Sequence, residues 1–144
     1  MKLMLKPAWL CLAFLFLIGL TACRDNDKPT PVDLNPITLA QAYPGDILKT
    51  DRIELLDGST GETRTVEDPA AIREWLTAIK NIRLIPDDNQ EGRAGYRFGI
   101  QLFQGEELKL GFIPNSVQNV YYESNEELET KVQAFFETQF GRKF

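Results

Sequence analysis

The sequence predicts an α+β fold for residues 47–144, a two-layer sandwich in which an antiparallel sheet of about four to six strands has two helices on one face. Apolar and polar residues alternate along the expected strands, so each strand has one apolar face. Each expected helix has a single apolar stripe, which one face of the sheet can cover. The expected order is β-β-α-(β)-β-β-β-α.

A β-hairpin is expected first, with strands at residues 52–57 and 62–67. In the first strand, Ile53 and Leu55 alternate with charged residues. Gly58 and nearby polar residues interrupt the pattern between the strands, as turn residues do.

A helix follows the hairpin. Asp68-Pro69 provides an N-cap and a proline at the first helical position. The apolar stripe of this helix consists of Ile72, Trp75, Leu76 and Ile79. Residues 82–86 are expected to form either a short strand or an irregular exit from the helix, which Pro86 stops.

An antiparallel meander is expected next, with strands at residues 96–103, 107–113 and 117–123. Turns at 104–106 and 114–115 connect them. The residues expected to face the helices are Tyr96, Phe98, Ile100, Leu102, Leu108, Leu110 and Phe112.

The last helix is expected to begin with a capping box, in which Ser124 and Glu127 satisfy each other's backbone donors. Gly141 is expected to end it. Its apolar stripe consists of Leu128, Val132, Phe135, Phe136 and Phe140. Helical spacing assigns these aromatic residues, like Trp75, to the core rather than to a ligand site.

The sheet face opposite the helices has an unusual expected composition. Glycines within strands allow a backbone or a flat ligand to approach closely, and this face has Gly99 and Gly111. Its candidate interaction surface consists of Arg97, Gln101, Phe103, Lys109 and Ile113. The alternatives are that the first hairpin or the preceding segment covers this face, or that water does.

The N-terminal segment has the features of a secretory signal, because Lys2 and Lys6 precede a short apolar stretch. This stretch is too short to span a membrane comfortably. It ends in Leu20-Thr21-Ala22-Cys23, which matches the lipobox, and the sequence here resembles bacterial lipoprotein precursors.

The resemblance implies that residues 1–22 are a signal peptide and that Cys23 becomes the mature N-terminus, carrying diacylglycerol. Two palmitate-type acyl chains, at about 0.8 kcal/mol per buried CH₂, would hold the protein stably on a bilayer. The expected location is the outer face of the cell membrane. In a host with two membranes, Arg24 after the cysteine implies the outer membrane.

Residues 23–46 are expected to form a lipidated, proline-rich tether. They contain four prolines and show no sustained strand or helix period. Extended polyproline geometry, at about 3.1 Å per residue, gives a reach of about 60 to 70 Å. Residues 37–43 are more apolar and are expected either to remain in the tether or to pack on the domain.

Residue composition excludes several kinds of site. The chain has no histidine, and its two cysteines are Cys11, in the signal, and Cys23. The mature chain therefore has no disulfide, no histidine-dependent triad and no histidine-bearing metal site. Loss of Lys2 and Lys6 leaves 14 basic against 21 acidic residues, a net charge of −7, which disfavours nucleic acid as a partner.

The loop at residues 87–95 resembles part of an EF-hand. Asp87, Asn89 and Glu91 occupy its first, third and fifth positions, but the twelfth is Phe98 instead of a bidentate carboxylate. We expect a solvated loop and no metal or other cofactor, with weak calcium binding left open.

A second resemblance covers most of residues 47–144. The hairpin, the Asp-Pro helix start, the meander and the run VYYES before the last helix resemble small YhfM-like envelope proteins of Bacillus-type bacteria. That family implies a location and a fold but no activity.

Two functions are therefore expected as alternatives. The first is a lipid-anchored binding or interaction module without enzymatic activity, which contacts the membrane through Cys23 and recognises an envelope protein. The second is a surface hydrolase or carbohydrate-active enzyme that relies on carboxylates, although no pair is selected by spacing. No catalytic residue is assigned.

Overall fold

The computed structural model describes residues 34–144. The predicted signal peptide, Cys23 and the first part of the predicted tether lie outside these residues. The described helices are α1 (Leu39–Ala42), α2 (Pro69–Ile79) and α3 (Glu126–Phe140), with a 3₁₀ turn, η1, at Ile47–Lys49. The strands are β1 (Arg52–Asp57), β2 (Thr63–Val66), β3 (Phe98–Gln104), β4 (Glu107–Ile113), β5 (Ser116–Val117) and β6 (Val120–Tyr121).

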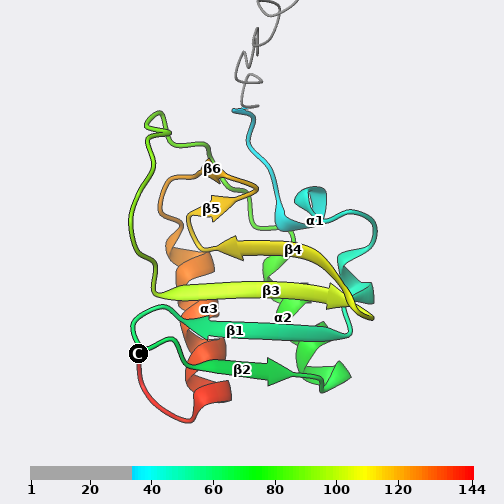
Figure 1. Ribbon diagram of the computed structural model, residues 1–144. Helices are drawn as coiled ribbons and strands as arrows, with labels where there is room; N and C mark the ends of the chain where they lie inside the picture. The colour runs from blue at the N-terminus through cyan, green and yellow to red at the C-terminus, as the bar shows by residue number, and fades with distance from the viewer. Residues whose placement is uncertain (1–33) are drawn as a thin grey trace, which may run out of the picture. The chain divides into compact units, whose positions relative to one another are not determined.

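The strands form one antiparallel sheet in the order β2-β1-β3-β4-β5-β6. Helices α2 and α3 lie behind this sheet in Figure 1, and the viewer looks onto the opposite face. The predicted fold class, an antiparallel sheet with two helices on one face, is confirmed. We call the face turned toward the viewer the open face.

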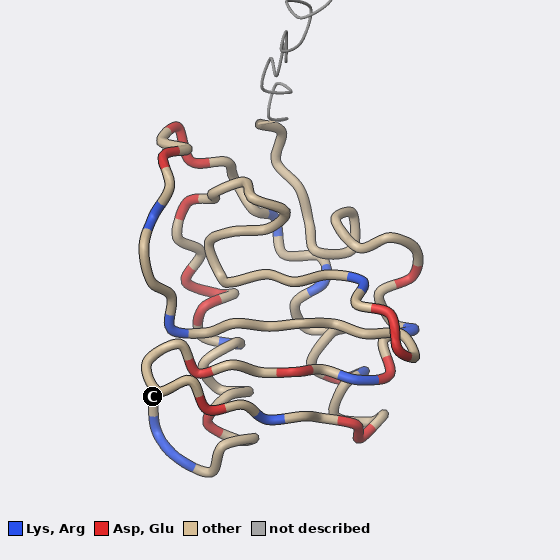
Figure 2. The backbone as a smooth tube through the Cα atoms, in the orientation of Figure 1, with Lys and Arg blue, Asp and Glu red and all other residues tan. Residues whose placement is uncertain are grey.

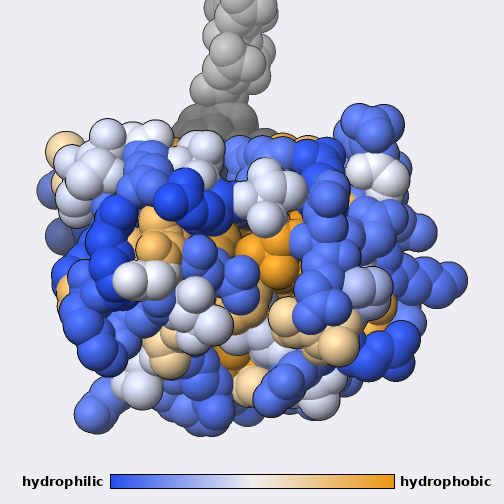
Figure 3. Space-filling model, turned by 90° about the horizontal axis from the view of Figure 1, so that it is seen from below, coloured by the Kyte–Doolittle hydropathy of each residue, from blue (hydrophilic) through white to orange (hydrophobic). Residues whose placement is uncertain are grey.

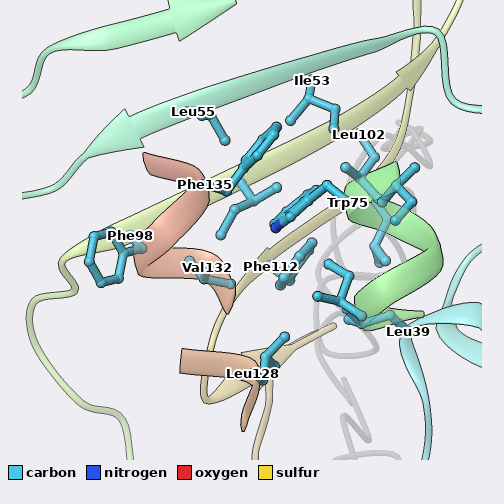
Figure 4. Packing of buried hydrophobic residues seen from close by; sticks show 14 of the residues in the cluster. Leu39, Ile53, Leu55, Trp75, Phe98, Leu102, Phe112, Leu128, Val132 and Phe135 are labelled. Atoms are coloured by element: carbon cyan, nitrogen blue, oxygen red, sulfur yellow. The ribbon is translucent and has the colours of Figure 1, made fainter. Parts of the chain in front are cut away.

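The core lies between the sheet and the two helices (Figure 4). The predicted apolar stripes of both helices are buried there. The ring of Trp75 stacks on that of Phe135 with their centroids 4.3 Å apart. Trp75 Nε1 also donates a hydrogen bond to the backbone oxygen of Lys131, at 3.3 Å. The predicted placement of these aromatic residues in the core is confirmed.

The third predicted strand of the meander is wrong in detail. Gln118 and Asn119 have positive φ angles of 52° and 65°. Two consecutive residues of this conformation form a tight hairpin turn, so residues 117–123 fold back between β5 and β6. The optional strand at residues 82–86 is replaced by isolated bridges that pair Ile37 with Leu84 and Pro86 with Tyr122.

Residues 37–43 pack on the domain. Thr38 and Gln41 form a capping box at α1, and Leu39 and Tyr43 are part of the core. The packed part of the chain therefore begins N-terminal to residue 47.

The predicted capping box of Ser124 and Glu127 is wrong: the N-cap lies one residue later, and the N3 residue is then Leu128, which cannot complete a box. Asn125 is the N-cap of α3, and its Oδ1 accepts a hydrogen bond from the Leu128 N–H at 3.0 Å. Its Nδ2 donates to the backbone oxygen of Arg83 at 3.3 Å. Asparagine caps as well as serine does, and this second, long-range hydrogen bond favours Asn125. The predicted stop at Gly141 is confirmed by its left-handed conformation.

Two residues predicted to face the helices are exposed instead. The strand register shifts between Leu102 and Phe103, so Leu102 pairs with Leu110 but Phe103 pairs with Leu108. This bulge places Leu108 on the open face together with its pairing partner Phe103. Leu108 is 48% exposed. Tyr96 precedes β3 and is 46% exposed, because the alternation begins only at Phe98.

Candidate functional site

The open face has a hollow of about 290 Å³ over the middle strands of the sheet. Strands β1, β3 and β4 provide most of its floor. The residues that line it include Leu56, Tyr96, Gly99, Gln101, Gly111 and Ile113. Glu54 and Thr63 also line it. In the part of the chain that the structure describes, no helix covers this face (Figure 1).

The two glycines of this hollow have different surroundings. A Cβ atom on Gly99 would lie 3.0 Å from Cε2 of Tyr96 and 3.3 Å from Cβ of Leu56. At Gly99 the close approach that a glycine allows is therefore taken by the ring of Tyr96 from the same chain. A Cβ atom on Gly111 would meet only the backbone oxygen of Ile100, at 3.9 Å. The floor at Gly111 therefore has room for another group.

A second hollow, of about 360 Å³, adjoins the first and shares Tyr96 and Ile113 with it. It lies near the start of β3 and the end of β4, at the left in Figure 1. The residues that line it include Arg97, Asn115, Glu129 and Gln133. Because Glu129 and Gln133 belong to α3, this second hollow extends around the end of the sheet toward the helix side. We call the two adjoining hollows together the open-face trough.

Three of the five residues predicted as an interaction surface line this trough. Gln101 and Ile113 line the first hollow, and Arg97 lines the second. The guanidinium carbon of Arg97 lies 5.4 Å from the ring centroid of Phe98 and 5.8 Å from that of Phe144. Within residues 34–144, the Arg97 guanidinium has no ion pair and no hydrogen bond, so its N–H groups can donate to a ligand.

The other two predicted residues, Phe103 and Lys109, lie near the turn that connects β3 to β4, away from the second hollow. Phe103 is only 9% exposed, since the guanidinium of Arg52 lies 3.9 Å from its ring centroid. Lys109 Nζ is ion-paired with Glu107 Oε2 at 2.7 Å. Neither lines the trough.

Several residues that line the trough are not predicted from the sequence, among them Tyr96. Strand alternation predicts a core position for Tyr96, but β3 begins only at Phe98. The preceding Gly95, with a φ of +82°, ends the loop and changes the direction of the chain. A glycine immediately before an aromatic residue was the available signal that the strand had not yet begun.

In the loop at residues 87–95, the side chain at the first EF-hand position is used within the loop itself. Asp87 Oδ2 accepts a hydrogen bond from the Arg93 guanidinium at 2.6 Å, and its Oδ1 accepts from the Asn89 N–H. This contact with Arg93 is the main reason that the pKa of Asp87 is lowered. Among residues 34–144 there is no cluster of three or more carboxylate or thiol side chains suited to a metal ion.

Hydrophobic residues also reach the surface on the side that contains β2 (Figure 3). A separate hollow of about 360 Å³ lies between α2 and α3. Its lining includes Trp75 and Phe135, which are 7% and 8% exposed. These rings belong to the core, and the hollow exposes only their edges.

The most buried carboxylate lies at the end of β1. Asp57 is 3% exposed and its Oδ2 is 2.7 Å from the Arg142 guanidinium. Burial alone would raise the pKa of Asp57, but hydrogen bonds from the Ser59 N–H, the Thr60 hydroxyl and Arg142 lower it. Figure 2 shows the basic segment 142–143 beside acidic positions at the adjoining ends of β1 and β2.

Two further carboxylates are stabilised by the same segment. Arg142 also contacts Glu62, whose pKa is lowered mainly by that hydrogen bond. The hydrogen bond from Lys143, followed by those from Gln133 and the Phe144 N–H, lowers the pKa of Glu137 to about 2. In their ionised form, Asp57, Glu62 and Glu137 hold residues 141–144 against the domain.

Stability is therefore expected to fall in acid. A carboxylate whose pKa is lowered by folding binds fewer protons in the native state than in the unfolded one. Its contribution is present above the unfolded values of 3.8 for Asp57 and 4.5 for Glu137, and is lost as the pH falls through the lowered native pKa, which is about 2 for Glu137. Denaturant unfolding measured across this pH range should show a declining midpoint.

Arg142→Met should weaken that pH dependence and lower stability at neutral pH, because Asp57 and Glu62 lose their shared cation. Arg73 is exposed and has no ion pair in the described chain, so Arg73→Met is the matched control. An unchanged acid profile in Arg142→Met would contradict the role given to this residue.

No protein-family model, curated protein or solved structure matches the chain. The resemblances to lipoprotein precursors and to YhfM-like proteins remain predictions from sequence. Within residues 34–144, every helix is too short or too polar to cross a membrane.

Proposed function

We propose that this chain is a lipid-anchored binding module of the bacterial cell envelope and that the open-face trough is its binding surface. The observation that carries the anchoring is Leu20-Thr21-Ala22-Cys23 at the end of the apolar N-terminal stretch. A lipidated Cys23 followed by a proline-rich tether would keep the domain close to the membrane and outside it.

The trough supports a binding role because several of its polar side chains are not used by the fold, although Glu54 and Gln133 have partners within the domain. Gln101 and the Tyr96 hydroxyl make no hydrogen bond within residues 34–144, and Arg97 has no ion pair there. Ligand sites typically combine apolar walls with a few such polar groups. Leu56 and Ile113 provide apolar walls here.

The carboxylate-dependent hydrolase remains the alternative function. A glycosidase of that kind needs two carboxyl groups facing one bond, one of them with a raised pKa. Glu54 lines the first hollow and is ion-paired with Arg52. The carboxylates whose pKa values shift clearly, such as Asp57 and Glu137, shift downward. We therefore favour binding over hydrolysis.

Replacement of Cys23 tests the anchoring. Cys23→Ala is expected to move the protein from the membrane fraction to the soluble fraction, or to leave it as the uncleaved precursor, because the acceptor thiol is lost. Fractionation of cells and mass spectrometry of the protein distinguish these results. Cys11→Ala is the matched control and should be processed and anchored normally. A Cys23→Ala protein of mature, lipid-modified mass in the membrane fraction would refute the proposal.

A further inference from the structure

We infer that the ligand of the open-face trough is an uncharged carbohydrate chain, with one sugar ring stacked on Tyr96. This inference rests on the proposed binding function and assigns its ligand class. It is carried by the charge of the trough, by the position of the Tyr96 ring and by the pairing of the strands beneath it.

The charges of the trough balance one another once Arg52, which lies beside it, is counted with the lining residues Glu54, Arg97 and Glu129. Glu54 is ion-paired with Arg52. In the second hollow, Arg97 and Glu129 have opposite charges. A strongly anionic ligand would approach Glu129 and the acidic domain, and a cationic ligand would approach Arg97. An uncharged ligand is repelled by neither Glu129 nor Arg97.

The Tyr96 ring is positioned to stack on a flat group. The ring lies over Gly99, which has no side chain to hold the ring away from the sheet. Tyr96 as a residue is 46% exposed. The apolar face of a sugar ring matches an exposed aromatic face. The Gln101 and Asn115 side-chain amides and the Thr63 hydroxyl can exchange hydrogen bonds with sugar hydroxyls.

The strands under the trough do not favour an extended peptide. Peptides that bind to sheets usually add a strand at a free edge. Strand β1 is paired with β2 and β3, and β3 is paired with β1 and β4. The trough therefore lies over interior strands, where a peptide backbone would find its partners already taken. Sugar hydroxyls that do not contact the protein remain in water.

The test is titration of the isotope-labelled domain with a library of uncharged oligosaccharides that covers gluco, galacto, manno and N-acetylglucosamine units. At least one member is expected to shift the amide NMR signals of residues around Tyr96, Gln101 and Gly111. Tyr96→Ala should weaken its binding about tenfold, equivalent to about 1.4 kcal/mol, whereas Tyr96→Phe keeps the ring and should bind nearly normally.

A glycine pair provides the matched control. Gly111→Ala should fold normally, since its Cβ has only an ordinary contact at 3.9 Å, but its methyl group occupies the trough floor and should weaken binding. A Cβ on Gly92 would meet nothing within 4 Å, and this residue does not line the trough. Gly92→Ala should bind like the unchanged protein.

Three results would overturn the inference: no signal shift with any member of the library, tighter binding of an acidic oligosaccharide such as oligogalacturonate, or equal binding by Tyr96→Ala. A photoreactive residue at Gln101 in intact cells then separates the two proposals. Capture of one defined protein, lost in Gly111→Ala, would reject the carbohydrate and retain the binding function. Absence of both capture and oligosaccharide binding would reject both.

Discussion

Phe136→Ala is expected to destabilise the domain by about 3 to 5 kcal/mol, the usual cost of removing a buried phenylalanine side chain. Phe136 is 0% exposed. Its ring centroid lies 4.7 Å from that of Phe98, 5.5 Å from that of Phe140 and 5.7 Å from that of Phe144. The substitution leaves a cavity where β3, α3 and the last residues meet. Denaturant unfolding should show the loss as a lower midpoint.

Leu108→Ala is the matched control, because Leu108 is 48% exposed on the open face. Its free energy of unfolding should change by less than about 0.5 kcal/mol. If Phe136→Ala cost less than about 1 kcal/mol, the described packing around this ring would be wrong.

Gly58→Ala is expected to cost about 2 to 3 kcal/mol through overpacking. A Cβ on Gly58 would lie 1.9 Å from the backbone oxygen and 2.9 Å from the backbone carbon of Tyr96. The Gly58 N–H also donates to the backbone oxygen of Arg97 at 2.8 Å. The methyl group would therefore push the segment before β3 away from the end of β1. Denaturant unfolding and the amide signals of residues 95–99 should both report this change.

Gly92→Ala is again the control, since a Cβ there has open space and the glycine has no positive φ. It should be neutral or stabilise by up to about 1 kcal/mol, because alanine restricts the unfolded chain. Unchanged stability and unchanged Tyr96 signals in Gly58→Ala would refute this close backbone approach. The prediction also bears on the trough, because Tyr96 forms its shared wall.

The helices and most strands could be predicted because their signals are local. Asp68-Pro69 caps α2 as expected, and the spacing of apolar residues along α2 and α3 places their buried stripes correctly. The α3 N-cap could not be predicted to the residue, because Ser124 and Asn125 are both good caps. The hydrogen bond from Asn125 to Arg83, 42 residues away, distinguishes them.

The candidate site could be predicted only in part. Alternation places Gln101 and Ile113 on the open face, since successive strand residues point to opposite sides. It could not exclude Phe103, because the cover of this ring by Arg52 depends on the pairing of β1 with β3. The sequence pattern also could not show that Arg93 forms an ion pair with Asp87, because such a contact depends on how the loop folds.

Local sequence patterns predict the two-layer class, the buried faces of the helices and a lipid anchor at Cys23, since each depends on residues close together in the chain. Three other features emerge only in the folded chain: Tyr96 lies on Gly99, a bulge exposes Leu108, and residues 118–119 divide a strand. The first two features depend on register and contact between distant segments. The third requires two unfavourable left-handed residues, Gln118 and Asn119, which the surrounding fold stabilises: Gln118 Nε2 donates to the backbone oxygen of Ala42 at 3.0 Å.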